Sequence, residues 1–239
     1  MYRALAKVAA ISGVVAGVSL AAALAIGGPE LRRSGIGFDN GLRPGLDDHG
    51  RPATGAVREQ SNFTAIDAGG GVETEVIVGP AFRVEVLGPH PEHIMTRLEG
   101  GALRIRPRGH LFWWGHDDLP AVRIAMPALA AIRSSAGARV GASGVNADTL
   151  DLRANSGARI DASGTCRDVH MEASSGAELR TAALICQSGH VDASSGADLD
   201  VNVSGKLDVD ASSGATVRNA AGAKPGLVSL HSGADLVTR

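Results

Sequence analysis

The sequence predicts an all-β fold, a short β-solenoid preceded by an export segment and a linker. A glycine-centred element of small residues recurs every 18 to 20 residues in the second half of the chain. Stretches in which apolar and polar residues alternate, typical of half-buried strands, come before it. No amphipathic helix of useful length follows the export segment. Aromatic residues are scarce (Phe 4, Trp 2, Tyr 1), so the core must consist of small aliphatic side chains.

Residues 1–29 are expected to direct export. Arg3 and Lys7 form a positive flank, and positions 8–29 carry no charge. Residues 23–25 (Ala-Leu-Ala) match a cleavage site of a signal peptide, whereas an uncharged run of this length could also span a bilayer as an uncleaved anchor. Both alternatives place the remainder in the periplasm or at the cell surface, with membrane contact only through this segment.

A disordered linker is expected at residues 30–60, ahead of a folded domain at residues 61–239. The linker is rich in Gly, Pro, Arg and Asp and has no sustained hydrophobic period. From residue 61 onward, alternation predicts short strands at residues 73–78, 82–87, 103–106 and 122–126.

The repeated element defines coils of about 19–20 residues, because a fixed period of this length indicates stacked units that bury their apolar faces against each other. Its central glycines are Gly137, Gly157, Gly176, Gly196, Gly214 and Gly233. Five residues before each glycine stands an apolar column of Ile132, Leu152, Met171, Val191, Val209 and Val228. Three residues after each glycine stands another, of Val140, Ile160, Leu179, Leu199, Val217 and Leu236. We expect both columns to be buried, their outward neighbours to be exposed, and the glycine to turn a corner.

Three stretches carry a resemblance to a known family. They are FTAIDAGGGVETEVIVGPAFRVEVLG, LEGGALRIRP, and VRIAMPALAAIRSSAGARV with the SSGA repeats that follow. Residues 61–239 resemble the bacterial family of putative auto-transporter adhesin head GIN domains. The resemblance implies a right-handed parallel β-helix exported to the cell envelope, with no established activity and no catalytic residues to transfer. The aromatic insertion before Pro120 is longer than the family's usual polar turn.

The expected function is therefore a non-enzymatic adhesive or binding surface of the cell envelope, without a cofactor, whose partner is an envelope protein or a glycan. A net charge of −2 disfavours nucleic acid as a partner. No G-x-S-x-G or S-x-x-K motif occurs, and residues 194–200 lack the double glycine of a calcium β-roll. Two alternatives stay open: a polysaccharide hydrolase or lyase built on a β-helix, and a purely structural envelope module.

The aromatic insertion is the candidate contact site. It brings together Phe112, Trp113, Trp114, His116, Asp117 and Asp118. Indole rings with nearby polar groups could stack on a sugar or enter a partner's surface. Alternatively, the insertion folds back as a plug over an open edge of the solenoid.

Two further groups follow from the coil alignment. The position six before the glycine is occupied by Asp151, His170, His190 and Asp208 on four successive coils. Such a ladder could hold zinc or nickel, or it could be only a hydrated face. Cys166 and Cys186 each precede a glycine by ten residues, so they should stack within disulfide range, either bonded or as free thiols. The segment His-Pro-Glu-His at residues 90–93 is expected to be a solvated turn.

Overall fold

The computed structural model describes residues 56–88, 90–108 and 121–238. The export segment, most of the expected linker and the aromatic insertion lie outside this part of the chain. The described residues form strands that belong to one 16-stranded sheet, together with one 3-10 turn. None of their helical segments has the length and apolar character needed to cross a membrane.

The elements follow one another closely along the chain. Their bounds are β1 Ala56–Arg58, β2 Ala65–Gly69, β3 Glu73–Val78, β4 Arg83–Leu87, η1 Pro91–His93, β5 Ile94–Glu99, β6 Ala102–Pro107, β7 Ala121–Met126, β8 Ala131–Ser135, β9 Arg139–Asn155, β10 Arg159–Ser174, β11 Glu178–Ala193, β12 Asp198–Val201, β13 Lys206–Ala211, β14 Thr216–Asn219, β15 Lys224–Leu230 and β16 Asp235–Thr238. The predicted strands at residues 73–78, 82–87, 103–106 and 122–126 correspond to β3, β4, β6 and β7.

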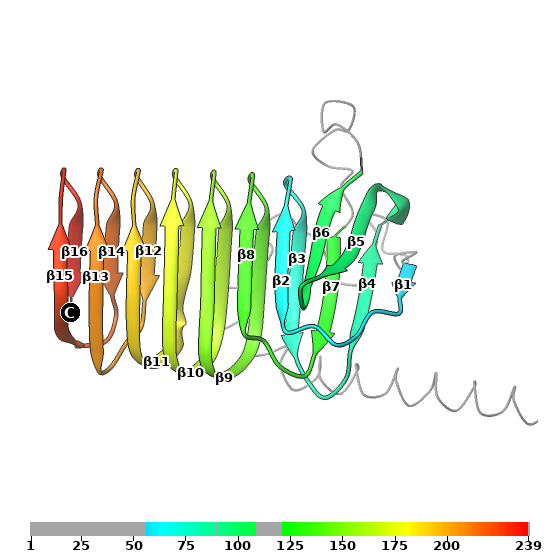
Figure 1. Ribbon diagram of the computed structural model, residues 1–239, viewed down its shortest axis with the longest axis horizontal. Helices are drawn as coiled ribbons and strands as arrows, with labels where there is room; N and C mark the ends of the chain where they lie inside the picture. Colours follow the sequence, from blue (N-terminus) through cyan, green and yellow to red (C-terminus); the bar gives the residue numbers. More distant parts are fainter. Residues whose placement is uncertain (1–55, 89, 109–120, 239) are drawn as a thin grey trace, which may run out of the picture. The chain divides into compact units, whose positions relative to one another are not determined.

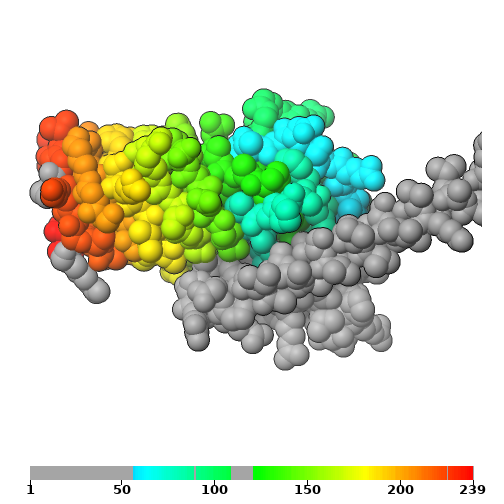
Figure 2. Space-filling view, turned by 90° about the horizontal axis from the view of Figure 1, so that it is seen from below, coloured from blue at the N-terminus to red at the C-terminus, as the bar shows by residue number. Residues whose placement is uncertain are grey.

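The solenoid has two faces, because each coil runs up one side, turns sharply and returns on the other (Figure 1). Face A contains the strands that lead into the tight turn: β6, β2, β8, the second halves of β9 to β11, β13 and β15. Face B contains the strands that follow the turn: β7, β3, the first halves of β9 to β11, β12, β14 and β16. Pairing within each face is parallel, and the later coils succeed one another in sequence order (Figures 1 and 2). The stacked parallel coils confirm the predicted β-solenoid.

Each tight turn is formed by two residues with left-handed backbone conformations. Ser175 and Gly176 have φ values of 54° and 68°, and the same pattern recurs at every repeat. The N–H of Ala177 closes the turn on the carbonyl of Ser174 at 3.2 Å. A Cβ atom on Gly176 would meet nothing within 4 Å, so glycine is favoured there by conformation rather than by space. Gly70 and Gly71 form an equivalent turn between β2 and β3, which the repeat alignment did not include.

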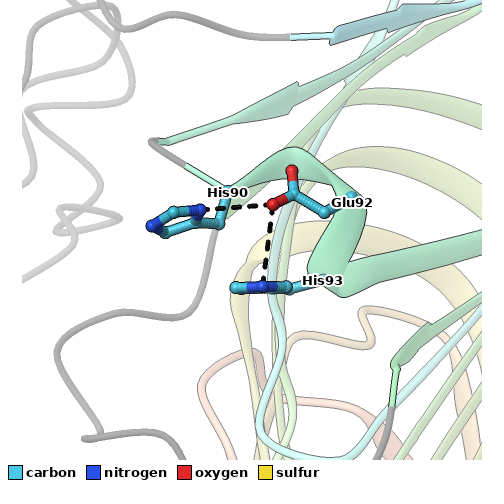
Figure 3. A group of neighbouring side chains, drawn as sticks. All are labelled: His90, Glu92 and His93. Atoms are coloured by element: carbon cyan, nitrogen blue, oxygen red, sulfur yellow. Dashed lines mark hydrogen bonds and ion pairs between the residues drawn. The ribbon is translucent and has the colours of Figure 1, made fainter.

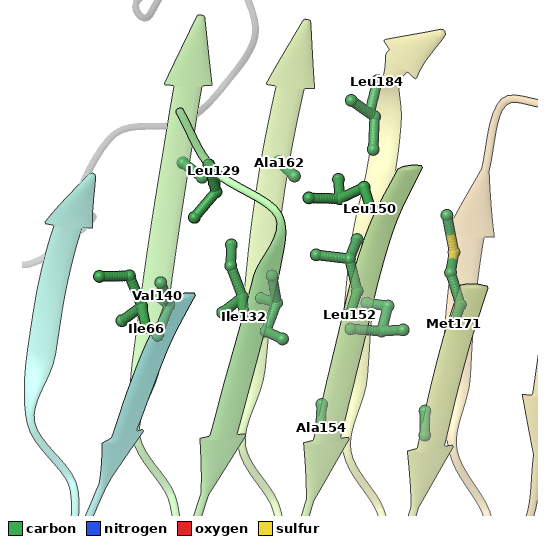
Figure 4. Close-up of a cluster of buried hydrophobic side chains, with 14 of the residues drawn as sticks. Ile66, Leu129, Ile132, Val140, Leu150, Leu152, Ala154, Ala162, Met171 and Leu184 are labelled. Atoms are coloured by element: carbon green, nitrogen blue, oxygen red, sulfur yellow. The ribbon is translucent and has the colours of Figure 1, made fainter. Parts of the chain in front are cut away.

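The two apolar columns form the core in the inner coils. All of their members from Ile132 to Val217 are buried, and Figure 4 shows such side chains directed between the two faces. The residues six before and two after the glycines are half-buried or exposed, and none is buried, so the side chains alternate as predicted although most of the outward ones are less exposed than expected. The last described coil differs, since no other described coil packs on its outer side. There Val228 is 42% exposed and Leu236 is half-buried.

The N-terminal end of the stack departs from sequence order. The coil made by β2 and β3 lies between the β6–β7 coil and the β8–β9 coil. Beyond β6 and β7, β5 and β4 add to the two faces in antiparallel orientation, and β1 pairs with β4. Strand β1 uses residues within the expected 30–60 linker, so the end of that stretch belongs to the sheet. The Arg58 side chain fastens it by donating to the carbonyl of Ile94 at 2.6 Å.

Candidate functional site

The aromatic insertion replaces a tight turn. It connects β6, which ends at Pro107 on face A, with β7, which begins at Ala121 on face B. In the repeated coils the same connection takes only a two-residue turn. Its predicted contact residues Phe112, Trp113, Trp114, His116, Asp117 and Asp118 lie outside the described residues, and their role as a contact or a plug stays a prediction.

A polar groove of about 310 Å³ lies on face A beside the tight turns. Its lining comes from β2, β8, β9 and β10 and consists mainly of charged, hydroxyl and amide side chains: Asp67, Arg133, Ser135, Arg153, Asn155, Glu172 and Ser174. These residues alternate with the buried core columns, because successive side chains of a strand point to opposite sides of the sheet. The groove was not predicted from the sequence, although the outward position of its residues follows from the repeat.

Both carboxylates of the groove are paired with arginines. Asp67 accepts hydrogen bonds from Arg106 at 2.8 Å and from Arg104 at 3.1 Å. Burial alone would raise the pKa of Asp67, but the two guanidinium groups outweigh burial and lower that pKa. Glu172 lies 3.1 Å from Arg153. Both carboxylates of the groove therefore have an arginine partner, and the lowered pKa keeps Asp67 ionised.

Arg133 differs from Arg153, the other arginine that lines the groove. The Arg133 side chain is exposed and forms no ion pair with any described residue. By contrast, Arg153 binds Asp151 through two hydrogen bonds of 2.8 and 3.0 Å, which raise the pKa of its guanidinium. Arg133 therefore offers a cationic, planar set of donors to an external carboxylate or hydroxyl group.

The ladder predicted to hold a metal is present as a column, but its carboxylates have other partners. Asp151, His170, His190 and Asp208 are paired in register across β9, β10, β11 and β13. Asp151 binds Arg153, as described above. Asp208 accepts from the Lys206 ammonium at 2.8 Å and from the Leu227 backbone N–H at 2.6 Å, and both bonds lower the pKa of Asp208.

The carboxylate that approaches the two imidazoles is Asp192. Its Oδ2 lies 3.3 Å from Nε2 of His190 and 4.0 Å from Nε2 of His170. Asp192 was not among the predicted metal ligands. The available signal was its position two residues after His190 on the same strand, which places both side chains on the same face.

A second group of histidines lies on η1. Glu92 Oε1 is 3.2 Å from His90 Nδ1 and 3.7 Å from His93 Nε2, so one carboxylate oxygen approaches a nitrogen of each ring (Figure 3). His90 and Glu92 are exposed, whereas the His93 side chain is 16% exposed. The segment expected to be a solvated turn is thus a 3-10 turn with one side chain packed inward.

The two cysteines are joined by a disulfide bond in the structure. Cys166 and Cys186 are register partners on β10 and β11, and their Cα atoms are 4.6 Å apart. Both are buried. Of the two alternatives that the coil alignment left open, the structure contains the bonded one.

Comparisons with known proteins agree with this architecture. Residues 62–223 match the family described as putative auto-transporter adhesin, head GIN domain. No curated protein sequence matches the chain. A crystal structure of a putative adhesin from Bacteroides fragilis NCTC 9343 is 11% identical, with a TM-score of 0.58 over 77% of this chain and 95% of that one. At this identity, the likeness shows the shared fold.

Two further solved structures cover a similar share of the chain. A putative lipid binding protein from Parabacteroides distasonis ATCC 8503 is 12% identical, with a TM-score of 0.45 over 78% of this chain and 96% of that one. A putative adhesin from Parabacteroides merdae ATCC 43184 is 8% identical, with a TM-score of 0.43 over 78% and 95%. Since the family match covers more than half of the sequence, the chain belongs to the family of putative auto-transporter adhesins with a head GIN domain.

Proposed function

We propose that this protein is a non-enzymatic binding module of the cell envelope that attaches to a glycan with acidic groups through the groove on face A. The observation that carries the proposal is the Arg133 guanidinium, which has no ion pair with any described residue and lies among hydroxyl and amide side chains in that groove. A guanidinium binds a carboxylate through two parallel hydrogen bonds, and serine and asparagine supply partners for sugar hydroxyls. The adhesin-like family and the expected export segment agree with a place in the periplasm or at the cell surface.

The polar groups of the groove repeat along the stack, which suits an extended partner. Ser135, Asn155 and Ser174 occupy the same position on successive coils, so their polar groups recur about every 4.8 Å along the stack. The sheet below them is fixed by ladder hydrogen bonds and a buried core. Little conformational entropy is therefore lost when a repetitive ligand binds.

The aromatic insertion is proposed as a second part of the same contact region. It follows β6, and β6 pairs with β2, the strand that contributes Asp67 to the groove. An insertion that starts one strand from the groove can supply Trp113 and Trp114 for stacking on sugar rings. Its length exceeds what the turn requires, which favours a contact role.

The polysaccharide hydrolase or lyase remains the alternative from another class. A glycoside hydrolase needs one carboxylic acid that stays protonated and a second carboxylate beside the bond to be cleaved. In the groove, Asp67 and Glu172 are both paired with arginines, and the pKa of Asp67 is lowered rather than raised. This arrangement favours binding over hydrolysis. A purely structural module would bind neither a glycan nor a protein.

A glycan array that includes acidic polysaccharides, followed by a pull-down from envelope extracts, tests the proposal with the purified chain. Arg133→Ala should weaken glycan binding about tenfold, the value of one lost charged hydrogen-bond pair. Arg139→Ala is the matched control, because Arg139 is an exposed arginine on face B that pairs with Glu73. Loss of binding in neither variant, or equal loss in both, would place the contact elsewhere. If the array and the pull-down yield no partner, the structural module is the better account.

Replacing both Trp113 and Trp114 by Ala separates the contact from the plug. If the rings bind the partner, attachment should be lost while the melting temperature stays nearly unchanged. If they cover the end of the solenoid, the same change should lower stability by several kcal/mol through lost apolar burial. A double variant that melts much lower and still binds normally would reject the contact role.

A further inference from the structure

The two histidines of face A form a closely matched pair on adjacent coils. His170 on β10 and His190 on β11 are register partners. Their rings stack with centroids 5.2 Å apart and an angle of 6° between the planes. Because both side chains stand on neighbouring strands of one ladder, their spacing is set by the sheet and not by a mobile loop.

Asp192 completes a group of three donors. Its Oδ2 lies near Nε2 of both imidazoles, at 3.3 and 4.0 Å, and the three ligand atoms all lie within 4.8 Å of one another. All three side chains are partly exposed, at 35%, 49% and 43% for His170, His190 and Asp192. The group therefore opens toward solvent, where a cation can enter and keep water ligands.

Among the described residues, the Asp192 carboxylate forms its ion pairs with the two histidines and not with an arginine or lysine. Three of the acidic side chains nearby are engaged, Asp151 and Glu172 by Arg153 and Asp208 by Lys206. Asp210, the register partner of Asp192, adds a further negative charge on the next coil. Within the described part of the chain, the ion pairs of Asp192 are those with the two imidazoles. Neutral imidazoles add no positive charge, so a cation placed between the three donors would meet a net negative field.

We propose that His170, His190 and Asp192 bind one divalent transition-metal ion, with zinc as the best match. Two imidazole nitrogens and one carboxylate oxygen are zinc ligands, and three protein ligands leave an open position for water or an external group. Tetrahedral coordination with bonds of about 2.0–2.1 Å brings ligand atoms to roughly 3.3 Å from each other. Side-chain rotation can close the group to that spacing while the strands stay in place. The site is independent of the glycan proposal, since it uses none of the groove's arginines.

The test is isothermal titration of zinc into the full chain, carrying no polyhistidine tag, after dialysis against a chelator. We expect one zinc ion per chain at this site, and at least about tenfold weaker binding in the double variant His170→Gln/His190→Gln. Cobalt provides a second readout, because the intensity of its visible absorption reports whether the bound ion is tetrahedral. Far-UV circular dichroism verifies that each variant keeps the fold.

Two matched controls make the result specific. Asp192→Asn should weaken binding, whereas Asp210→Asn, its register partner on β13, should not. The variant His90→Gln/His93→Gln removes the other histidine pair and should keep wild-type affinity. The proposal is overturned if the wild-type chain does not bind zinc, if the His170→Gln/His190→Gln variant binds as tightly as wild type, or if the His90→Gln/His93→Gln variant loses the ion instead.

Discussion

Single residues with special conformations or partners decide much of this fold. The repeated glycines were expected to turn corners, and they do so together with the preceding serine or alanine, which is also left-handed. The glycine could be predicted because only glycine adopts this conformation without cost. The serine could not, since its conformation follows from the turn and the inter-coil hydrogen bonds rather than from its own preference.

The buried side-chain amide of Asn219 takes the place of a neighbouring strand as hydrogen-bond partner of the Val203 backbone. Its Oδ1 accepts from the Val203 N–H at 3.0 Å, and its Nδ2 donates to the Val203 carbonyl at 3.1 Å. We expect Asn219→Ala to lower the free energy of unfolding by about 2–4 kcal/mol, because two buried backbone groups lose their partners. Urea denaturation measures this loss. In Asn202→Ala, where the Ala182 carbonyl is solvent-accessible, a loss below about 1 kcal/mol is expected. Equal losses in both variants would contradict this account.

Asp161 on face B should make stability depend on pH. Burial raises the pKa of its carboxyl, and the guanidinium groups of Arg159 and Arg180 offset this only in part. A carboxyl with a higher pKa in the folded state binds its proton more tightly there, so ionisation disfavours folding. Stability from this group is therefore present at low pH and is lost as the pH rises through the folded-state pKa.

Asp161→Asn replaces the carboxyl by an amide, which does not ionise. The variant should have a higher melting temperature than wild type at neutral pH, and the difference should shrink as the pH falls through the acid range. Thermal melts across the acid-to-neutral range provide the measurement. A variant that is less stable than wild type at neutral pH would show that the ionised carboxylate is net favourable beside its arginines.

At the level of strands and coils, the core columns are buried in the inner coils and partly exposed in the last described coil. Val209 and Val228 occupy the same column on adjacent coils, but Val209 is 2% exposed and Val228 is 42% exposed. Val209→Ala should therefore cost about 2–3 kcal/mol, and Val228→Ala less than about 1 kcal/mol. Chemical denaturation of both variants compares the two positions. Similar costs would mean that another surface covers the last coil.

The disulfide ties two neighbouring coils. It closes a loop with a sequence separation of 20 residues, for which loop-closure entropy predicts a contribution of roughly 3 kcal/mol. Cys166→Ala/Cys186→Ala should lose about this amount, as should wild type after reduction, because both lack the same cross-link. Thiol titration of protein exported under oxidising conditions should find no free thiol. Two free thiols would exclude the bond.

The candidate sites show how much of a site can be predicted from the alternation of inward and outward side chains along a strand. It placed His170 and His190 side by side on the exposed surface, because residues of one column recur in each coil. It named Asp151 and Asp208 as the nearby carboxylates and missed Asp192, the one that approaches both imidazoles. Which of the three carboxylates does so depends on Arg153 and Lys206, whose side chains reach along the face to specific acids. Likewise, the binding role proposed for the groove depends on which arginine has no ion pair among the described residues, and the spacing of the repeat does not determine this.

For the whole domain, the stacked coils were predictable and the N-terminal end was not. The period of about 19 residues is a local property of the sequence, and it determines both core columns. The insertion of the β2–β3 coil between two later coils depends on pairing between distant segments. Of the antiparallel strands, β4 was predicted as an ordinary short strand, since alternation does not distinguish parallel from antiparallel neighbours, and β5 was not predicted.

The family match, the stacked coils and the paired carboxylates of the groove together favour a protein that holds its partner without changing it. The most direct test is to mix the purified chain with acidic envelope polysaccharide and to measure both bound protein and polymer length in the same sample. The account predicts that the chain sediments with the polymer and that polymer length stays constant over time. Progressive shortening of the polymer, absent when the chain is omitted, would contradict it and establish a hydrolase or lyase.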